Sequence, residues 1–258
     1  MKNIIYFTYH RSEPIDFEWL KAAMRSVRKV AVADIIVVTD NMPAGERDVI
    51  KSKFKPDIQR IKSSEWDGRR TLCRLEQTDR IVQRLSPEGT RLIQSDIDVL
   101  FLKNPFVVFD EMSPDTALGV TRRMYDYHVS VNSGLVFFKV TDNVKRYTKW
   151  AVEQAKNPTW WPYLMLRGQR NNVDWGCDQD MVNAVYRNDG WIKHEFGFYV
   201  KDVGYEWNYC AGTDVLGFEP AAYLMRRALK VKDYSVLHFK GQYLKKLINE
   251  PCMKEYRG

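Results

Sequence analysis

The chain has few cysteines, and their placement argues against two kinds of protein. Only four occur among 258 residues, and no Cys-x-x-Cys pair is present. They are scattered along the chain at Cys73, Cys177, Cys210 and Cys252. A zinc site built from cysteines needs closely spaced pairs, and a disulfide framework is typical of much shorter secreted chains. We therefore expect reduced thiols with mainly structural roles.

Long hydrophobic runs are also missing. No apolar stretch approaches the roughly 20 residues that a helix needs to span a bilayer. The N-terminal apolar run, Ile4–Thr8, soon meets His10, Arg11 and Glu13. That run is too short and its surroundings are too polar for a secretory signal. The sequence predicts a cytoplasmic protein.

A long block of one charge sign is absent as well, although the net charge is +7. The densest basic groups are the pairs Arg69-Arg70, Arg122-Arg123, Arg226-Arg227 and Lys245-Lys246. A basic balance suits anionic partners. Because a nucleic-acid module needs clustered Lys and Arg interleaved with aromatic residues, we expect no nucleic-acid partner. A phosphate-binding cleft fits better, and a non-catalytic basic binding module stays as an alternative.

Strand and helix patterns alternate through the first part of the chain, which predicts an α/β domain. A hydrophobic fraction of 45% in 258 residues can fill one large core. Strand-like runs are Ile4–Thr8, Asp34–Asp40 and the run that begins at Arg91, and helical periods cover residues 15–32 and 68–85. This order predicts a parallel sheet covered by helices, with ligands at the C-terminal strand ends. Thr8, Asp40 and Asp96 fall at such ends.

The second part is less regular and contains no internal repeat or clear linker. The patterns predict strands at Ala117–Thr121, Gly134–Val140 and Val236–Phe239, and helices from Thr141 or Asp142 to about Lys156, from about Asp178 to Arg187 and from Leu244 to Asn249. Residues 157–176 are predicted as a loop or short helical insertion. We expect a single domain.

The stretch Arg91-Leu-Ile-Gln-Ser-Asp96-Ile-Asp98-Val-Leu-Phe-Leu-Lys-Asn-Pro105 predicts a buried strand that ends in two carboxylates. Residues two apart in an extended chain point to the same side, so Asp96 and Asp98 would lie close together. Ionised carboxylates repel one another and are costly to bury. A divalent cation removes that cost, and hard oxygen ligands suit Mg²⁺ or Mn²⁺, which can neutralise a diphosphate. A single Asp-x-Asp pair is otherwise more often a turn or surface feature.

Two other enzyme types share parts of this pattern. Asp96-Ile-Asp98-Val99 also fits the Asp-x-Asp-x-Thr/Val nucleophile motif of haloacid-dehalogenase-type phosphatases. That group usually carries the motif on its first strand, whereas two strands and two helices come first here. A nucleotidylyltransferase has the same type of sheet, but Phe7-Thr8-Tyr9-His10 lacks the glycines of its N-terminal loop. The phosphatase remains the leading alternative enzyme.

Four short motifs occur in a fixed order along the chain. They are Asp96-Ile-Asp98, Val131-Asn132-Ser133-Gly134, Trp175-Gly-Cys-Asp178-Gln179-Asp180 and Val236-Leu-His238-Phe-Lys-Gly241. In this order the chain resembles the GT-A-fold glycosyltransferases, with the greatest likeness to families 8 and 77, from about Ile4 to Lys246. The resemblance implies one α/β catalytic domain over residues 1–258, with a mostly parallel central sheet flanked by helices. Residues 1 to about 105 would form the nucleotide-binding half, and about 106–258 the donor-sugar and acceptor half.

The resemblance implies a metal centre. Asp96 and Asp98 match the family's metal motif, and His238 matches its C-terminal histidine ligand. The implied ion is Mn²⁺ or Mg²⁺ on the diphosphate of a nucleotide sugar, and an imidazole ligand suits Mn²⁺ better. A lone histidine after a strand is otherwise most often a core or surface residue.

The same resemblance implies residues around the donor sugar. Asn132, Ser133 and Gly134 match the step that contacts the sugar, although they also fit an ordinary turn before a strand. Asp178 and Gln179 match the pair of the retaining families near the anomeric carbon, where a carboxylate can stabilise an oxocarbenium-like transition state. Asp178 also fits a helix N-cap. The pair favours a retaining mechanism.

Residues for the nucleotide and its phosphates follow from the strand ends and from the resemblance. For the nucleotide they are Thr8, Tyr9, Asp40, Arg70, Arg74 and Ser95, and for the phosphates Lys240, Gly241 and Lys245. The family has a lysine three residues after the glycine, where this chain has Leu244, so the identity of the phosphate-binding lysine stays open. The implied donor is a UDP- or GDP-sugar.

Aromatic residues suggest an acceptor site. Trp160, Trp161 and Tyr163 could stack on a sugar, touch a membrane that carries a lipid-linked acceptor, or simply pack in the core. Glu206 and Trp207 lie in a segment that resembles the family's late Trp/Tyr-Asn segment, and Glu206 is a candidate base if the enzyme inverts. The acceptor would be a hydroxyl on a glycan, a lipid or a protein.

Overall fold

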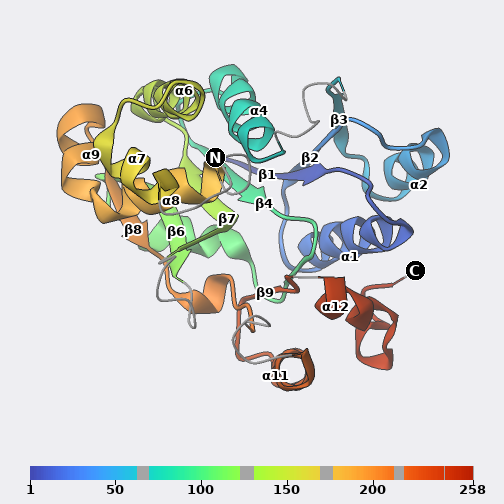
Figure 1. The fold of residues 1–258 in the computed structure, drawn as a ribbon. Coiled ribbons are helices and arrows are strands. Elements are labelled where there is room, and N and C mark those ends of the chain that lie inside the picture. Colours follow the sequence, from blue (N-terminus) through green and yellow to red (C-terminus); the bar gives the residue numbers. More distant parts are fainter. Residues whose placement is uncertain (63–69, 123–130, 169–176, 212–217, 241, 258) are drawn as a thin grey trace.

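The computed structural model describes residues 1–62, 70–122, 131–168, 177–211, 218–240 and 242–257 (Figure 1). Its large sheet has seven strands, in the order β3 (Asp57–Arg60), β2 (Asp34–Thr39), β1 (Lys2–Tyr9), β4 (Thr90–Ser95), β7 (Val131–Lys139), β6 (Thr116–Arg122) and β8 (Tyr199–Asp202). Strand β7 runs antiparallel to both of its neighbours, and the other pairs in the sheet are parallel. The mostly parallel sheet predicted from the sequence is confirmed.

The described α-helices are α1 (Pro14–Val30), α2 (Ala44–Phe54), α4 (Arg70–Arg84), α5 (Val108–Glu111), α6 (Asp142–Lys156), α7 (Trp161–Gly168), α8 (Cys177–Arg187), α9 (Asp189–Phe196), α11 (Phe218–Val231) and α12 (Gln242–Lys245). Short 3₁₀ turns are η1 (Pro105–Val107), η2 (Tyr205–Trp207), η3 (Lys246–Asn249) and η4 (Pro251–Met253). Among the described residues, no helix combines the length and apolarity needed to cross a membrane.

The central strand β1 shows why the sheet is covered on both faces. Ile4 and Tyr6 pack in a core cluster with residues of α4, α6 and α8. Ile5 and Phe7 point the other way and pack in a second cluster with residues of α1 and α2. Because successive side chains alternate between faces, a strand with both faces buried is apolar throughout. The apolar run at the N-terminus is therefore a central strand.

Local capping explains where two of the helices begin. Pro14 is the first residue of α1. Glu13 and Asp16 form a capping box, in which the side chain of each residue accepts a hydrogen bond from the backbone N–H of the other. At α6 the Thr141 side chain accepts a hydrogen bond from the N–H of Val144 at 3.1 Å. The predicted start and end of that helix are confirmed.

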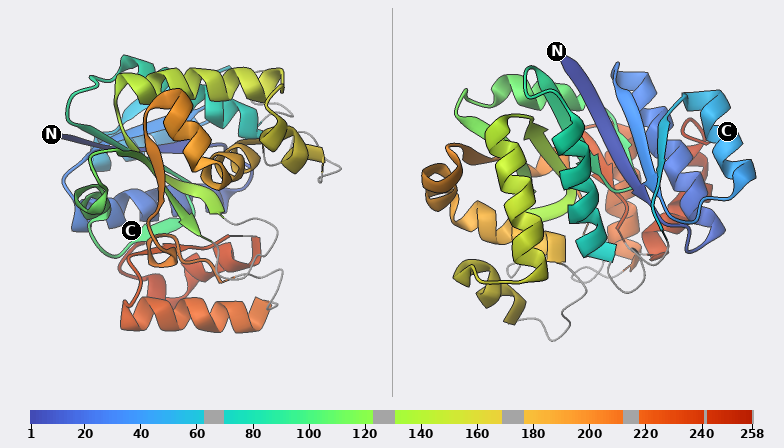
Figure 2. Two further views of the ribbon diagram at one scale, coloured as in Figure 1. Left: turned by 90° about the vertical axis from the view of Figure 1, so that its left-hand side faces the viewer. Right: turned by 90° about the horizontal axis from the view of Figure 1, so that it is seen from above.

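A third core cluster lies between α1, α11 and the C-terminal turns. The left view of Figure 2 shows the C-terminal helices below the main sheet. Trp19 and Ala22 of α1 pack there against residues of α11 and of the C-terminal turns. A two-stranded antiparallel sheet joins this part to the rest, with β5 (Val99–Phe101) paired to β9 (Val236–His238). The C-terminal segment is thereby fixed beside the end of β4.

Two expectations about local structure need correction. The carboxylates Asp96 and Asp98 do not lie on an extended strand, because β4 ends at Ser95 and β5 starts at Val99 in the other sheet. The step at 132–134 is not a turn before a strand, because β7 begins at Val131. The pairing of β6 with β7 shifts register here, since the consecutive residues Val120 and Thr121 lie opposite Val136 and Asn132, so the extra residues of the irregularity lie in β7.

Several elements were not predicted. The helices α2, α9 and α11 and the strands β3 and β8 were missing from the sequence interpretation. β3 and β8 have four residues each and lie at the edges of the sheet, and α2 buries only Ile50 and Phe54. Such elements carry a weak periodic signal. In contrast, α11 carries a readable pattern in the buried residues Ala221, Met225 and Ala228.

Candidate functional site

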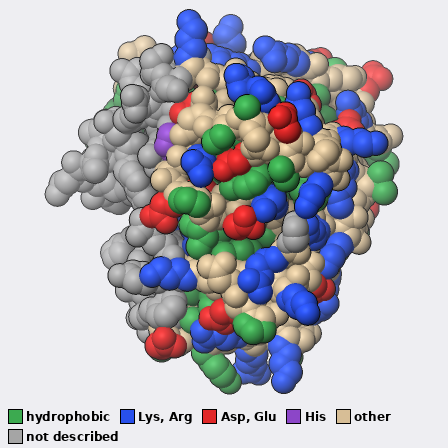
Figure 3. Space-filling model, turned by 90° about the vertical axis from the view of Figure 1, so that its right-hand side faces the viewer, with side chains coloured by type: hydrophobic (Ala, Val, Ile, Leu, Met, Phe, Trp, Pro, Cys, Tyr) green, Lys and Arg blue, Asp and Glu red, His purple; other side chains and the backbone are tan. Residues whose placement is uncertain are grey.

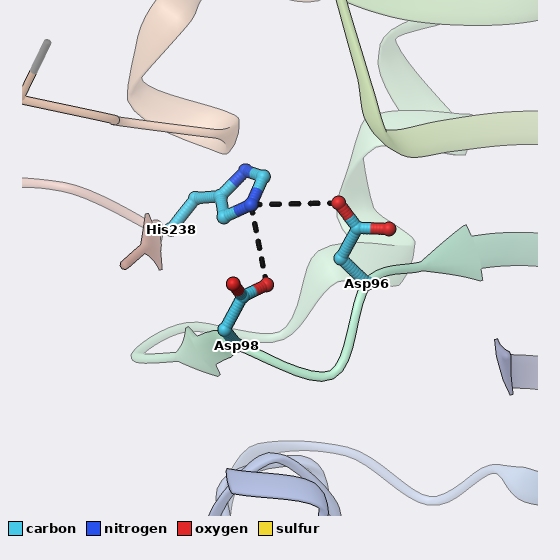
Figure 4. Close-up of side chains that lie close together, drawn as sticks. All are labelled: Asp96, Asp98 and His238. Carbon is cyan, nitrogen blue, oxygen red and sulfur yellow. Dashed lines mark ion pairs between the residues drawn. The ribbon is translucent and has the colours of Figure 1, made fainter. Parts of the chain in front are cut away.

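The pairing of β5 with β9 brings three possible metal ligands together. His238 lies opposite Val99 in this pairing, directly beside Asp98. Its Nε2 atom is 3.3 Å from Oδ1 of Asp98 and 3.5 Å from Oδ2 of Asp96 (Figure 4). One ligand atom from each of the three side chains lies within 4.8 Å of the other two. Residues 140 positions apart in the sequence thus converge at the end of β4.

The three side chains fit a divalent cation. An ion about 2.1 Å from each of its ligands keeps neighbouring ligand atoms roughly 3 to 4 Å apart. The distances of 3.3 and 3.5 Å from His238 Nε2 to the two carboxylates fall in this range. Two carboxylates with one imidazole supply the oxygen and nitrogen donors of a divalent-cation site. Gly134 borders the same space, since a Cβ atom there would lie 2.4 Å from Cε1 of His238 and 2.8 Å from Oδ2 of Asp96. The absence of a side chain at this position keeps the ligands in place.

The Gly134→Ala variant is expected to weaken Mn²⁺ binding at least about 10-fold, because the new methyl group must displace a ligand side chain. Binding is measured by electron paramagnetic resonance of free Mn²⁺, with thermal unfolding as the check on the fold. The matched control is Gly45→Ala in α2, where a Cβ atom would meet nothing within 4 Å. Equal Mn²⁺ affinity in wild type and Gly134→Ala would contradict the placement of the site.

Lys245 supplies positive charge beside this cluster. Its ammonium nitrogen lies 3.7 Å from Oδ2 of Asp98 and 3.1 Å from Oδ1 of Asp16. Burial raises the pKa of the Asp98 carboxyl, but His238 and Lys245 together lower that pKa to about 2. Asp98 is therefore ionised at neutral pH, as a metal ligand must be.

Arg74 of α4 connects the group of possible metal ligands to Asp178. Its guanidinium forms ion pairs with Asp96 and Asp178, and it also donates a hydrogen bond to the Ser133 hydroxyl at 2.8 Å. Burial lowers the pKa of Arg74, but the two carboxylates outweigh it and raise that pKa, so the guanidinium is charged. Arg74, Asp96, Ser133 and Asp178 thus form one continuous polar network.

Asp178 and Gln179 lie in the first turn of α8, which begins at Cys177, so Asp178 is not the N-cap. Asp178 is almost fully buried, and its Oδ1 atom has no hydrogen-bond partner among the described residues. The Gln179 amide oxygen accepts hydrogen bonds from the N–H of Ser133 at 3.0 Å and from its hydroxyl at 3.1 Å. The amide nitrogen donates to the carbonyl of Val131. Gln179 therefore ties α8 to β7, and Asp178 keeps an oxygen available to a ligand.

The proposed nucleotide-binding residues gather at one edge of the sheet. Thr8 and Tyr9 end β1, and Ser95 ends β4 in register with Phe7. The Thr8 hydroxyl is buried with no hydrogen-bond partner among the described residues. The Tyr9 hydroxyl donates to Glu46 at 2.8 Å, and the Asp40 carboxylate pairs with His10 at 3.0 Å. Thr8 is therefore the residue of this set whose side chain has a hydrogen-bonding group left for a ligand.

Two further nucleotide and phosphate candidates lie at the start of α4 and after β9. Arg70 is the first residue of α4. Lys240 follows β9 and is partly buried. Gly241 lies outside the described residues. Among the lysine candidates, Lys245 has a defined place beside the metal cluster.

The predicted acceptor aromatics have different environments. Tyr163 is fully buried, and the Trp160 ring packs 5.1 Å from Trp150, so both serve the core. Trp161 is 69% exposed. Trp207 is buried, while Glu206 is partly buried with its carboxylate folded against Gly204. Trp161 is the member of the aromatic set with a surface that a sugar or membrane could reach.

The sequence interpretation assigned no role to Asn208. Its amide oxygen lies 3.1 Å from Nδ1 of His238, and its amide nitrogen donates to the Thr121 hydroxyl at 3.0 Å. The resemblance of its segment to a family motif was the available signal. The pairing itself depends on the contact between β9 and η2, which no local pattern predicts.

Comparison with known proteins gives a family match. The nucleotide-diphospho-sugar transferase family matches residues 62–225. No curated protein matches the chain at the level of sequence.

Similar folds occur among solved structures, at low sequence identity. Mouse xyloside xylosyltransferase 1 has 14% identity and a TM-score of 0.57, over 93% of this chain and 97% of that chain. The galactosyltransferase LgtC, in complex with donor and acceptor sugar analogues, has 14% identity and a TM-score of 0.59, over 93% and 87% of the two chains. The glycosyltransferase GlyE of Streptococcus pneumoniae TIGR4 has 12% identity and a TM-score of 0.57, over 99% of this chain and 62% of that chain. At such identities the likeness concerns the fold alone.

Proposed function

The chain belongs to the nucleotide-diphospho-sugar transferase family, and on that premise we propose that it is a metal-dependent, retaining glycosyltransferase. It would move a sugar from a nucleoside diphosphate sugar to a hydroxyl group of an acceptor. The observation that carries the proposal is the convergence of Asp96, Asp98 and His238 within 4.8 Å, connected through Arg74 to Asp178. The arrangement supports a diphosphate on the metal cluster and a sugar toward Asp178.

Different residues of the chain would have different roles in the transfer. When bound, Mn²⁺ or Mg²⁺ supplies Lewis-acid stabilisation for the negative charge that builds up on the departing diphosphate. Lys245 adds positive charge beside Asp98, in reach of the same phosphates. The Asp178 carboxylate stabilises positive charge at the anomeric carbon, and Arg74 holds that carboxylate in place. The proposal of retention rests on the match of Asp178 and Gln179 to the pair of the retaining families, and the anomeric configuration of the product checks it.

The nucleotide would lie across the ends of β1, β2 and β4, within the half formed by residues 1 to about 105. The buried, unsatisfied hydroxyl of Thr8 supports this placement. We propose a UDP- or GDP-sugar as donor and a glycan, lipid-linked or protein acceptor. Exposed Trp161 is the candidate for stacking on the acceptor or for peripheral contact with a membrane.

On the face drawn in Figure 3, Lys and Arg side chains are spread among acidic and hydrophobic ones.

Calorimetric titration of the protein with UDP, GDP, CDP and TDP, each with and without Mn²⁺, tests the function. We expect one nucleotide to bind tightly only when the metal is present, because the carboxylate cluster repels a diphosphate otherwise. That result names the base of the donor. Absence of binding by all four, with and without metal, would contradict the proposal.

The His238→Ala variant is expected to weaken Mn²⁺ and nucleotide binding together, by about 10- to 100-fold, because it removes the nitrogen ligand. His194→Ala is the matched control, since His194 is exposed on α9. The same titrations measure both ligands. Unchanged binding of both in His238→Ala would remove this residue from the site.

A further inference from the structure

The imidazole of His238 lies between two asparagine side chains on the side away from the carboxylates. Its Nδ1 atom is 3.1 Å from Oδ1 of Asn208 and 3.2 Å from Nδ2 of Asn132. All three side chains are almost fully buried. The same ring nitrogen therefore faces one hydrogen-bond acceptor and one donor.

Other hydrogen bonds orient the two amides. The Asn132 oxygen accepts a hydrogen bond from the N–H of Gly134 at 2.9 Å, which turns its NH₂ group toward the ring. The Asn208 nitrogen donates to the Thr121 hydroxyl at 3.0 Å, which turns its oxygen toward the ring. Two different strands therefore fix the two amides. Thr121 of β6 keeps the Asn208 oxygen facing the ring, and Gly134 of β7 keeps the Asn132 NH₂ group facing it.

The two asparagines favour different tautomers of His238. A neutral imidazole carries its proton on one nitrogen, and the other nitrogen has the lone pair. With the proton on Nδ1, the ring donates to Asn208 and directs the Nε2 lone pair at the carboxylate cluster. With the proton on Nε2, the Nδ1 atom accepts from Asn132 and Nε2–H points toward Asp98. The first tautomer can ligate a cation through Nε2, and the second cannot.

We propose that Asn208 is a positioning residue of the metal centre, whose amide oxygen selects the His238 tautomer that presents Nε2 to a divalent cation. Asn132 competes by stabilising the other tautomer. In the tautomer that would hold a metal, with the proton on Nδ1, the Asn132 NH₂ group would have no acceptor on the ring and would be available to a sugar hydroxyl. This inference rests on the proposed metal-dependent function and extends it to the coupling of metal and sugar.

Two substitutions at position 208 separate this role from packing. Asn208→Leu keeps the approximate volume but removes the acceptor, so Mn²⁺ affinity is expected to fall about 10- to 100-fold. Asn208→Asp keeps an acceptor oxygen that binds Nδ1–H more strongly, so Mn²⁺ affinity is expected to stay equal or rise. A purely structural role gives the opposite order, because a buried leucine is tolerated better than a buried carboxylate. Electron paramagnetic resonance of free Mn²⁺ gives the affinities without an activity assay.

The Asn132→Ala variant is expected to shift the His238 tautomer in the opposite direction from Asn208→Leu. It removes the competing donor, so Mn²⁺ affinity is expected to be equal to or higher than that of the wild type. Nitrogen-15 NMR of the histidine side chains in the metal-free protein, recorded at a pH at which the His238 ring is neutral, reports the tautomer directly. The fraction of His238 with the proton on Nδ1 should fall in Asn208→Leu and rise in Asn132→Ala.

The outcomes distinguish this inference from the proposed function. Wild-type Mn²⁺ affinity in Asn208→Leu, with binding lost in Asp98→Ala, would overturn the role of Asn208 and leave the metal centre standing. No Mn²⁺ binding by the wild-type protein would overturn the metal centre itself. If Asn208→Leu does not fold, as judged by circular dichroism, weaker Mn²⁺ binding in Asn208→Asp would overturn the inference, and equal or tighter binding would support it.

Discussion

Replacing Asp98 with alanine is expected to lower metal-dependent sugar transfer by at least about 100-fold while the protein stays folded. Asp98 is buried and ionised, with its pKa lowered to about 2, and it contributes one of the three clustered ligand atoms. Its loss leaves one carboxylate and His238, too few ligands to hold the ion on a diphosphate. The measurement is turnover of the nucleotide sugar identified by calorimetry, across a series of Mn²⁺ concentrations.

The fold should survive this change because the neighbouring charge has a second partner. Lys245 keeps its 3.1 Å ion pair with Asp16 when Asp98 is absent. Asp34→Ala is the matched control, since the Asp34 side chain is 65% exposed and pairs only with Lys2 among the described residues. Full Mn²⁺-dependent turnover in Asp98→Ala would show that the ion is held elsewhere, and unfolding would show that Asp98 has a structural role we have not assigned.

The first half of the fold was predictable because its strands carry a strong local signal. β1 and β2 are apolar on both faces, and α1 and α4 repeat their apolar residues with a helical period. Parallel strands end at the same edge of a sheet, so the polar residues after β1, β2 and β4 could be expected to gather there. The metal motif was found for the same reason.

Contacts between distant segments could not be predicted in the same way. The position of His238 depends on the register of β5 with β9, and neither three-residue strand determines that register alone. Arg74 was expected to reach the nucleotide, but its ion pairs with Asp96 and Asp178 require α4 and α8 to pack side by side. His238 was assigned to the site from the order of motifs shared with the family. The residues around it in the sequence do not predict that position.

The Arg74→Met variant is expected to reduce the free energy of unfolding by about 3 kcal/mol in the absence of metal. The guanidinium compensates the charge of Asp178, whose side chain is only 2% exposed, and that of Asp96, whose side chain is 30% exposed. Removing it leaves the buried Asp178 carboxylate unpaired, which is the main cost, because solvent screens Asp96. Urea unfolding of wild type and variant measures the difference, with Arg122→Met as a control whose side chain is 63% exposed.

A double variant shows whether that loss comes from the unpaired charge. Asp178→Asn removes the carboxylate charge, so Arg74→Met should cost less in the Asp178→Asn background than in the wild type. A coupling free energy of about 1 kcal/mol or more in this cycle supports a stabilising Arg74–Asp178 pair. If the two single losses simply add, Arg74 stabilises the fold through packing of its side chain. Since Asp178 is also the proposed catalytic carboxylate, a coupled pair means that the ion pair that stabilises the fold also orients the group beside the anomeric carbon.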